Sequence, residues 1–174
     1  MKKLLLIFFL FGLLFFNNCA KNEKKEIVKI QEDKIEAQMT RAYQEGMVAF
    51  DNRLYLEAAK KFNEAEILFP QSEWAPRSAL MAAYAYYYGD YNNRAISELI
   101  NFFKKYPKDP NTSYAHYLLA MSYYNTIIDE KKDLEPLKNS KQQFEYIVEN
   151  YPNTEFSLDS KFKLDLINEM IASK

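Results

Sequence analysis

The stretch Ala83–Pro107, AYAYYYGDYNNRAISELINFFKKYP, decides the fold. It predicts the end of one helix, a tight turn at Gly89–Asp90 and a second helix that stops at Tyr106–Pro107, because proline cannot continue a helix. An aromatic residue also precedes Pro70 and Pro152, so these stops lie 37 and then 45 residues apart. A period of this length with two helices per unit is typical of a helical-hairpin solenoid.

The segments around this stretch carry apolar residues at three- and four-residue spacings, as amphipathic helices do. In the first unit, Gly46 and Ala58 occupy positions at which tetratricopeptide repeats keep small residues, and Phe62 fills the space towards the next unit. We therefore expect an all-α tetratricopeptide-repeat helical-hairpin solenoid of about three repeats plus a C-terminal capping helix. The predicted repeats span residues 38–70, 72–107 and 110–152, and the capping helix spans 154–173.

The composition favours one domain that presents a surface. The chain has 174 residues, of which only three are glycine, while 14 tyrosines and 13 phenylalanines supply bulky fillers for stacked helices. Its formal net charge is −1. Binding of nucleic acid needs a concentrated basic face, so this balance gives no electrostatic reason to expect a nucleic-acid partner.

The N-terminus predicts export. Lys2 and Lys3 precede a thirteen-residue apolar run, Leu4–Phe16. As a helix this run spans about 20 Å, which is short of the roughly 30 Å hydrocarbon core, so a secretory signal over residues 1–18 is favoured over a membrane span. The only cysteine, Cys19, follows directly, where a bacterial lipoprotein carries its lipid.

We therefore predict a covalent lipid on Cys19 and no other cofactor. Two alternatives stay open: an uncleaved anchor, and a cleaved signal followed by an incidental cysteine. Position 20 is alanine and not the aspartate of an inner-membrane retention signal, which favours the outer membrane. Residues 19–34 are expected to form the lipidated N-terminus and a flexible linker, because KNEKKE has nothing to bury. The repeat domain then covers residues 35–174.

No catalytic or metal-binding constellation is visible in the sequence. No phosphate-binding loop of a known kind is present, and the chain has one histidine and one cysteine. We therefore predict neither a zinc site nor an enzyme. The single histidine, His116, is expected to serve packing in the core or in a groove.

The tyrosines give the strongest indication of a binding surface. Consecutive helical residues point about 100° apart, so a run such as Tyr86–Tyr88 cannot face the core at every position. Tyrosine suits peptide recognition, since it combines a large rigid apolar ring with a hydroxyl tip. The alternative is that they are half-buried residues between repeats. The candidate groove residues are Tyr84, Tyr86, Tyr88, Tyr91, Tyr114, Tyr117 and Tyr124.

Two blocks of the sequence carry a resemblance to a known family. GDYNNRAISELINFFKKYPKDPNTSYAHYLLAMSYY covers residues 89–124 and DLEPLKNSKQQFEYIVENYPNTEFSLDS covers residues 133–160. Within them, Pro110–Asn111 and Tyr151–Thr154 match the family pattern. The chain resembles the BamD family, the lipoproteins of the outer-membrane β-barrel assembly machinery.

The resemblance implies a non-enzymatic scaffold that is anchored by its lipid at the periplasmic face of the outer membrane. The implied partners are the POTRA domains of a BamA homologue, other lipoproteins of the assembly machinery and unfolded segments of outer-membrane proteins. Better-known members continue for further repeats that contribute to BamA docking. A second hypothesis is a tetratricopeptide coordinator of the cell envelope that acts with Tol-Pal or the peptidoglycan machinery. The partner discriminates the two hypotheses.

Overall fold

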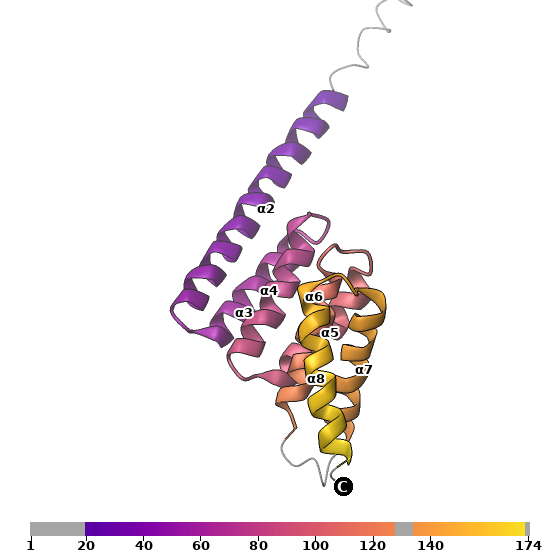
Figure 1. The fold of residues 1–174 in the computed structure, drawn as a ribbon. Helices are drawn as coiled ribbons and strands as arrows, with labels where there is room; N and C mark the ends of the chain where they lie inside the picture. The colour runs from indigo at the N-terminus through magenta and orange to yellow at the C-terminus, as the bar shows by residue number, and fades with distance from the viewer. Residues whose placement is uncertain (1–19, 128–133, 173–174) are drawn as a thin grey trace, which may run out of the picture. The chain divides into compact units, whose positions relative to one another are not determined.

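The computed structural model describes residues 20–127 and 134–172, and within them the chain is entirely helical (Figure 1). This confirms the all-α, repeat-like fold that the sequence predicts. The signal peptide and Cys19 lie outside the described residues. The seven described helices are α2 (Ala20–Asp51), α3 (Tyr55–Leu68), α4 (Trp74–Tyr88), α5 (Asn92–Lys105), α6 (Thr112–Asn125), α7 (Glu135–Asn150) and α8 (Glu155–Ala172).

The segment that we expected to be a flexible linker is helical from Ala20 onwards. It contains no proline or glycine and is rich in lysine and glutamate, which have good helix propensity, so helical hydrogen bonding can continue through it. The chain divides into two compact units, residues 1–38 and 39–174, and α2 contributes to both.

Within residues 39–174 the helices pack in chain order. Each of α3 to α7 contacts the next helix, and in addition α4 contacts α6 and α6 contacts α8. The helices α4, α6 and α8 therefore lie next to one another in one layer. The second helices of the three predicted repeats, α3, α5 and α7, each end two residues before a proline. Proline disfavours helical geometry in the residue before it, which explains these stops.

The core takes one phenylalanine from each second helix. Phe62, Phe102 and Phe144 are at most 1% exposed. Close approach of the paired helices depends on Gly46, since a Cβ atom there would lie 2.8 Å from the ring of Phe62. Alanines fill much of the remaining core, among them Ala58. Small residues thus bring the helices together, and large aromatic rings fill the wedges between repeats.

The turns inside the first two hairpins share an unusual backbone geometry. Arg53 and Asp90 occupy equivalent positions and have φ angles of 61° and 64°. The predicted turn at Gly89–Asp90 is present, but Asp90 and not the glycine takes the left-handed conformation. The Asp90 carboxylate accepts a hydrogen bond from Asn92 Nδ2 at 3.2 Å, a local bond that makes this conformation tolerable. Gly89 is needed for space, since its Cβ would lie 2.8 Å from the Cβ of Tyr55.

The last described helix, α8, packs against α6 and α7 and buries Ile167. Its opposite face differs from the polar surface expected of a cap, because Leu158 is 75% exposed and Phe162 is 60% exposed. Phe162 lies four residues after Leu158, so both project from one side of the helix. Among residues 20–127 and 134–172, no helix combines the length and apolar character needed to cross a membrane.

Candidate binding groove

A row of aromatic rings runs across α2, α4, α6 and α8. The ring of Phe50 on α2 stacks on Tyr84 of α4 with 5.3 Å between centroids. Tyr84 in turn lies 4.6 Å from Tyr88 and 6.3 Å from Tyr114 of α6. Tyr114 lies 5.4 Å from Phe156 of α8. These five rings, which we call the aromatic row, connect α2, α4, α6 and α8 without a break.

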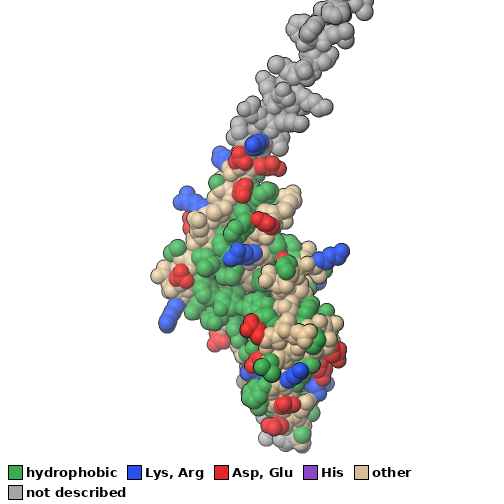
Figure 2. Space-filling view, turned by 45° about the horizontal axis from the view of Figure 1, so that its top comes forward, with side chains coloured by type: hydrophobic (Ala, Val, Ile, Leu, Met, Phe, Trp, Pro, Cys, Tyr) green, Lys and Arg blue, Asp and Glu red, His purple; other side chains and the backbone are tan. Residues whose placement is uncertain are grey.

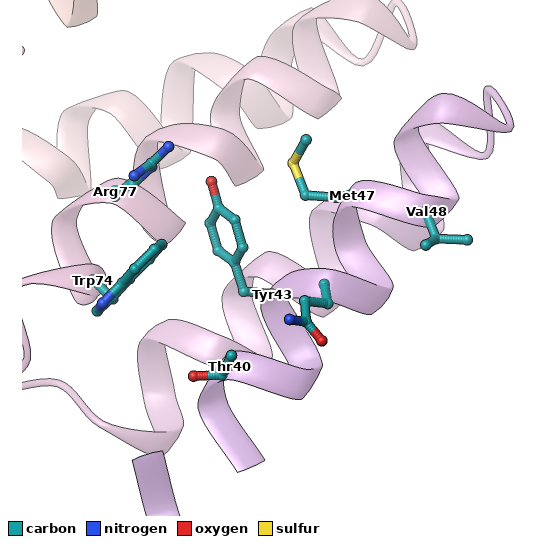
Figure 3. A pocket seen from close by; sticks show the side chains of 7 residues that line it. Thr40, Tyr43, Met47, Val48, Trp74 and Arg77 are labelled. Carbon is teal, nitrogen blue, oxygen red and sulfur yellow. The ribbon is translucent and has the colours of Figure 1, made fainter. Parts of the chain in front are cut away.

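A pocket of about 410 Å³ lies between α2 and the start of α4. In Figure 3 the ring of Tyr43 stands between the two helices, beside Trp74 and Arg77. The Tyr43 and Trp74 rings meet edge to face, with 5.4 Å between centroids. We call this the Trp74 pocket, and it is lined by Thr40, Tyr43, Gln44, Met47, Val48, Trp74 and Arg77.

A second pocket of about 410 Å³ lies between α4 and the start of α6. It contains two rings of the aromatic row, Tyr84 and Tyr114, and it shares Arg77 with the Trp74 pocket. We call it the Tyr84 pocket, and it is lined by Arg77, Leu80, Met81, Tyr84, Asn111 and Tyr114. Together with the aromatic row, the two pockets form what we call the inner groove.

The inner groove is apolar with few polar groups. Figure 2 shows hydrophobic side chains gathered in the middle of the visible face, with lysines, arginines and acidic residues scattered around them. Burial is the main cause that raises the pKa of Tyr84 to about 12, with a hydrogen bond to Tyr88 as a further cause. Burial also raises the pKa of Tyr114. Both hydroxyls therefore stay neutral and able to donate hydrogen bonds.

Three of the seven predicted groove tyrosines lie in the aromatic row: Tyr84, Tyr88 and Tyr114. Tyr88 is 52% exposed, whereas Tyr84 and Tyr114 are half-buried. Tyr117 is next to the row, because its ring lies 5.3 Å from Phe156. Its hydroxyl donates a 2.7 Å hydrogen bond to Asp159 of α8.

The other three tyrosines lie elsewhere. Tyr86 is 7% exposed and belongs to the core, so its prediction as a groove residue is wrong. It lies two residues, or about 200°, from Tyr84 and therefore points to the opposite side of α4. Tyr91 packs against Tyr86 and under Arg94, away from the aromatic row. Tyr124 is half-buried, with the Lys163 ammonium of α8 5.1 Å from its ring.

Sequence reasoning missed the Trp74 pocket. A signal was present, because Trp74 is the only tryptophan and Arg77 follows it at the three-residue spacing that places both on one helix face. The Arg77 guanidinium carbon lies 5.0 Å from the Trp74 ring and 5.8 Å from the Tyr43 ring. These contacts are cation–π interactions, which orient the guanidinium at the boundary of the two pockets.

His116 is a packing residue, as predicted. Its ring stacks on Phe103 at 4.1 Å and lies 4.3 Å from Tyr146, and its Nδ1 bonds to Gln143 Oε1 at 2.9 Å. Burial lowers the pKa of this imidazole. In the described part of the chain, no group of three or more His, Cys, Asp and Glu side chains could hold a metal ion.

Comparison with known proteins agrees with the sequence patterns. The model of the YfiO family, described as an outer membrane lipoprotein, matches residues 35–174. The outer membrane protein assembly factor BamD of Caulobacter vibrioides is 34% identical over 156 residues, which are 90% of this chain and 50% of that relative. The BamD of Rickettsia prowazekii is 31% identical over 172 residues, which are 99% of this chain and 65% of that relative.

The chain thus spans between half and two thirds of the length of these curated relatives. The resemblance to BamD and the predicted outer-membrane localisation are confirmed, whereas lipidation of Cys19 stays a prediction. By the match over residues 35–174, this chain belongs to the YfiO family of outer membrane lipoproteins.

Proposed function

We propose that this chain is a non-enzymatic scaffold lipoprotein for the assembly of outer-membrane β-barrel proteins. It binds the POTRA domains of a BamA homologue. It also presents unfolded barrel precursors for insertion into the outer membrane. The comparison supports this proposal, because the curated relatives are named outer membrane protein assembly factor. A lipid on Cys19 holds the scaffold at the periplasmic face.

The observation that carries this proposal is the inner groove. Unfolded barrel precursors are extended chains with alternating apolar side chains, and such chains need apolar recesses at intervals with polar groups between them. The Trp74 pocket and the Tyr84 pocket are two adjoining apolar recesses. Thr40, Gln44 and Asn111 add side-chain groups that can hydrogen-bond to a peptide backbone.

A crosslinking experiment in cells tests the proposal with the full chain. A photoreactive phenylalanine replaces Tyr84 or Tyr114 in the inner groove, and Ile67 in the control. Ile67 is 74% exposed on α3 and lines neither pocket. We expect crosslinks from the two groove positions to unfolded outer-membrane proteins, and few from position 67.

Purification of the tagged chain from membranes tests the partner. We expect a BamA homologue to be recovered together with other lipoproteins of the assembly machinery. Recovery of Tol-Pal or peptidoglycan-associated proteins alone, from a correctly localised chain, would support the cell-envelope coordinator in its place. Equal crosslinking of precursors from position 67 and from the groove would remove the inner groove from the proposal.

A further inference from the structure

We propose that Arg77 makes the inner groove selective for extended segments in which a carboxylate lies between two apolar side chains. This inference rests on the proposed function, since it assumes that the groove binds extended chains. It goes further by naming the chemistry of the preferred segment.

Arg77 is the one charged side chain among the described residues that line the Trp74 pocket and the Tyr84 pocket. A neighbouring pocket between α2 and α3 is different, because it contains both signs of charge. There Glu45 pairs with Arg41 at 3.0 Å and with Lys61 at 2.8 Å. A single cation in an apolar groove is complementary to a single anion with apolar neighbours.

The Arg77 side chain is held in place but has no anionic partner in the described part of the chain. Its guanidinium carbon lies 5.0 Å from the centre of the Trp74 ring and 5.8 Å from that of Tyr43, and this cation–π attraction restrains the side chain without using its N–H donors. In-plane N–H donors are left available, and a planar guanidinium matches a carboxylate by two parallel hydrogen bonds. The residue itself is exposed, so a ligand can reach it. Arg77 is thus oriented for an anion that the described part of the chain does not supply.

The position of Arg77 sets the order of side chains in the ligand. Arg77 is a shared wall of the two pockets, so a segment that fills both pockets passes over it. In an extended chain, every second side chain points to the same side, at intervals of about 7 Å. The preferred pattern is therefore an apolar residue, then a carboxylate two positions on, then an apolar residue after two more.

Fluorescent peptides with blocked ends test this pattern on the full chain. The first peptide contains FTDTF, and two matched peptides contain FTNTF and FTKTF. Binding is measured by fluorescence polarisation to the wild type, to Arg77→Gln and Arg77→Glu, and to Arg94→Gln. Arg94 is the matched control, because it also lies over two tyrosine rings but lines neither pocket.

We expect FTDTF to bind about tenfold more tightly than FTNTF, the effect of one hydrogen-bonded charge pair. Arg77→Gln should abolish this difference, Arg77→Glu should make FTKTF the preferred peptide, and Arg94→Gln should behave as the wild type. The reversed preference of Arg77→Glu also shows that this variant is folded.

Two results would count against the inference. Equal affinity of the wild type for FTDTF, FTNTF and FTKTF overturns the role of Arg77 and leaves the proposed function standing. Absence of binding by all the peptides, together with absence of precursor crosslinks from Tyr84 and Tyr114, overturns the inference and the groove-based function together.

Discussion

The second helices and the first helices both carry aromatic rings, but the rings differ in type and in burial. The second helices α3, α5 and α7 bury phenylalanines, whereas α4 and α6 contribute tyrosines to the aromatic row. On α3, α5 and α7, Phe62, Phe102 and Phe144 are at most 1% exposed. On α4 and α6, tyrosines of the aromatic row are half-buried or exposed, with Tyr88 at 52%. A phenylalanine ring has no polar atom to satisfy and can be fully buried, whereas a tyrosine hydroxyl needs water or a partner.

This difference separates stability from binding within one repeat. The phenylalanines fill wedges between helices, so their removal should unfold the stack. The tyrosines cover the groove side, and their removal should change what the groove holds with a smaller effect on folding.

The largest expected effect is that of Phe62→Ala. Phe62 is fully buried, lies against Gly46 and meets the Tyr43 ring at 5.2 Å. Its truncation should lower the free energy of unfolding by about 3–5 kcal/mol, because the surrounding helices cannot close the cavity. Urea unfolding followed by far-UV circular dichroism measures the loss.

The matched control is Tyr88→Ala, at the most exposed position of the predicted groove tyrosines. It should change the free energy of unfolding by no more than about 0.5–1 kcal/mol, since an exposed ring contributes little burial. Similar losses from Phe62→Ala and Tyr88→Ala would break the division between the two sets of rings.

The sequence predicts most of the fold, because the residues that end each helix and allow close packing follow a local pattern. The stops at Pro70, Pro107 and Pro152, and the small residue at Gly46, each depend on neighbours close along the chain or on a fixed repeat period. The high charge of residues 20–34 suggested a flexible linker, but the segment contains no proline or glycine and forms the start of α2.

The site was only partly predictable for a physical reason. Which side of α4 faces the groove depends on its neighbours α3, α5 and α6, so a run of tyrosines does not by itself separate Tyr84 from the buried Tyr86. The Trp74 pocket arises where α2 meets α4, and its lining comes from residues more than twenty positions apart in the sequence. Contacts of that kind follow from packing and not from a local pattern.

A middle-sized effect is expected for Tyr117→Phe, which removes one oxygen. The lost bond is the 2.7 Å hydrogen bond from the Tyr117 hydroxyl to Asp159, which joins α6 to α8. Hydrogen bonds to charged groups contribute roughly 1.5–3 kcal/mol to stability. Because Tyr117 is only partly buried, we expect the free energy of unfolding to fall by about 1–2 kcal/mol. Thermal unfolding detects it as a lower midpoint.

Tyr114→Phe is the matched control for this loss. Tyr114 packs on the same Phe156 ring, but no hydrogen bond of its hydroxyl is present in the described part of the chain. Because this substitution removes no hydrogen bond of that kind, Tyr114→Phe should leave the unfolding midpoint nearly unchanged. An equal decrease for both variants would mean that the ring environment and not the bond to Asp159 determines stability.

The smallest expected effect concerns His116, which lies among the rings of α5 and α7 and outside the groove. Burial lowers the pKa of its imidazole, so the unfolded chain, with a pKa of about 6.5, binds the proton more readily. Stability is therefore full above this value and falls as the pH drops through it.

His116→Phe keeps a ring between Phe103 and Tyr146 and removes the only histidine. The free energy of unfolding, measured in urea, should fall more for the wild type than for the variant between about pH 7.5 and about pH 5.5. An equal decrease in both would show that His116 is solvated in the folded chain, and would remove it from the set of rings that stabilise the stack.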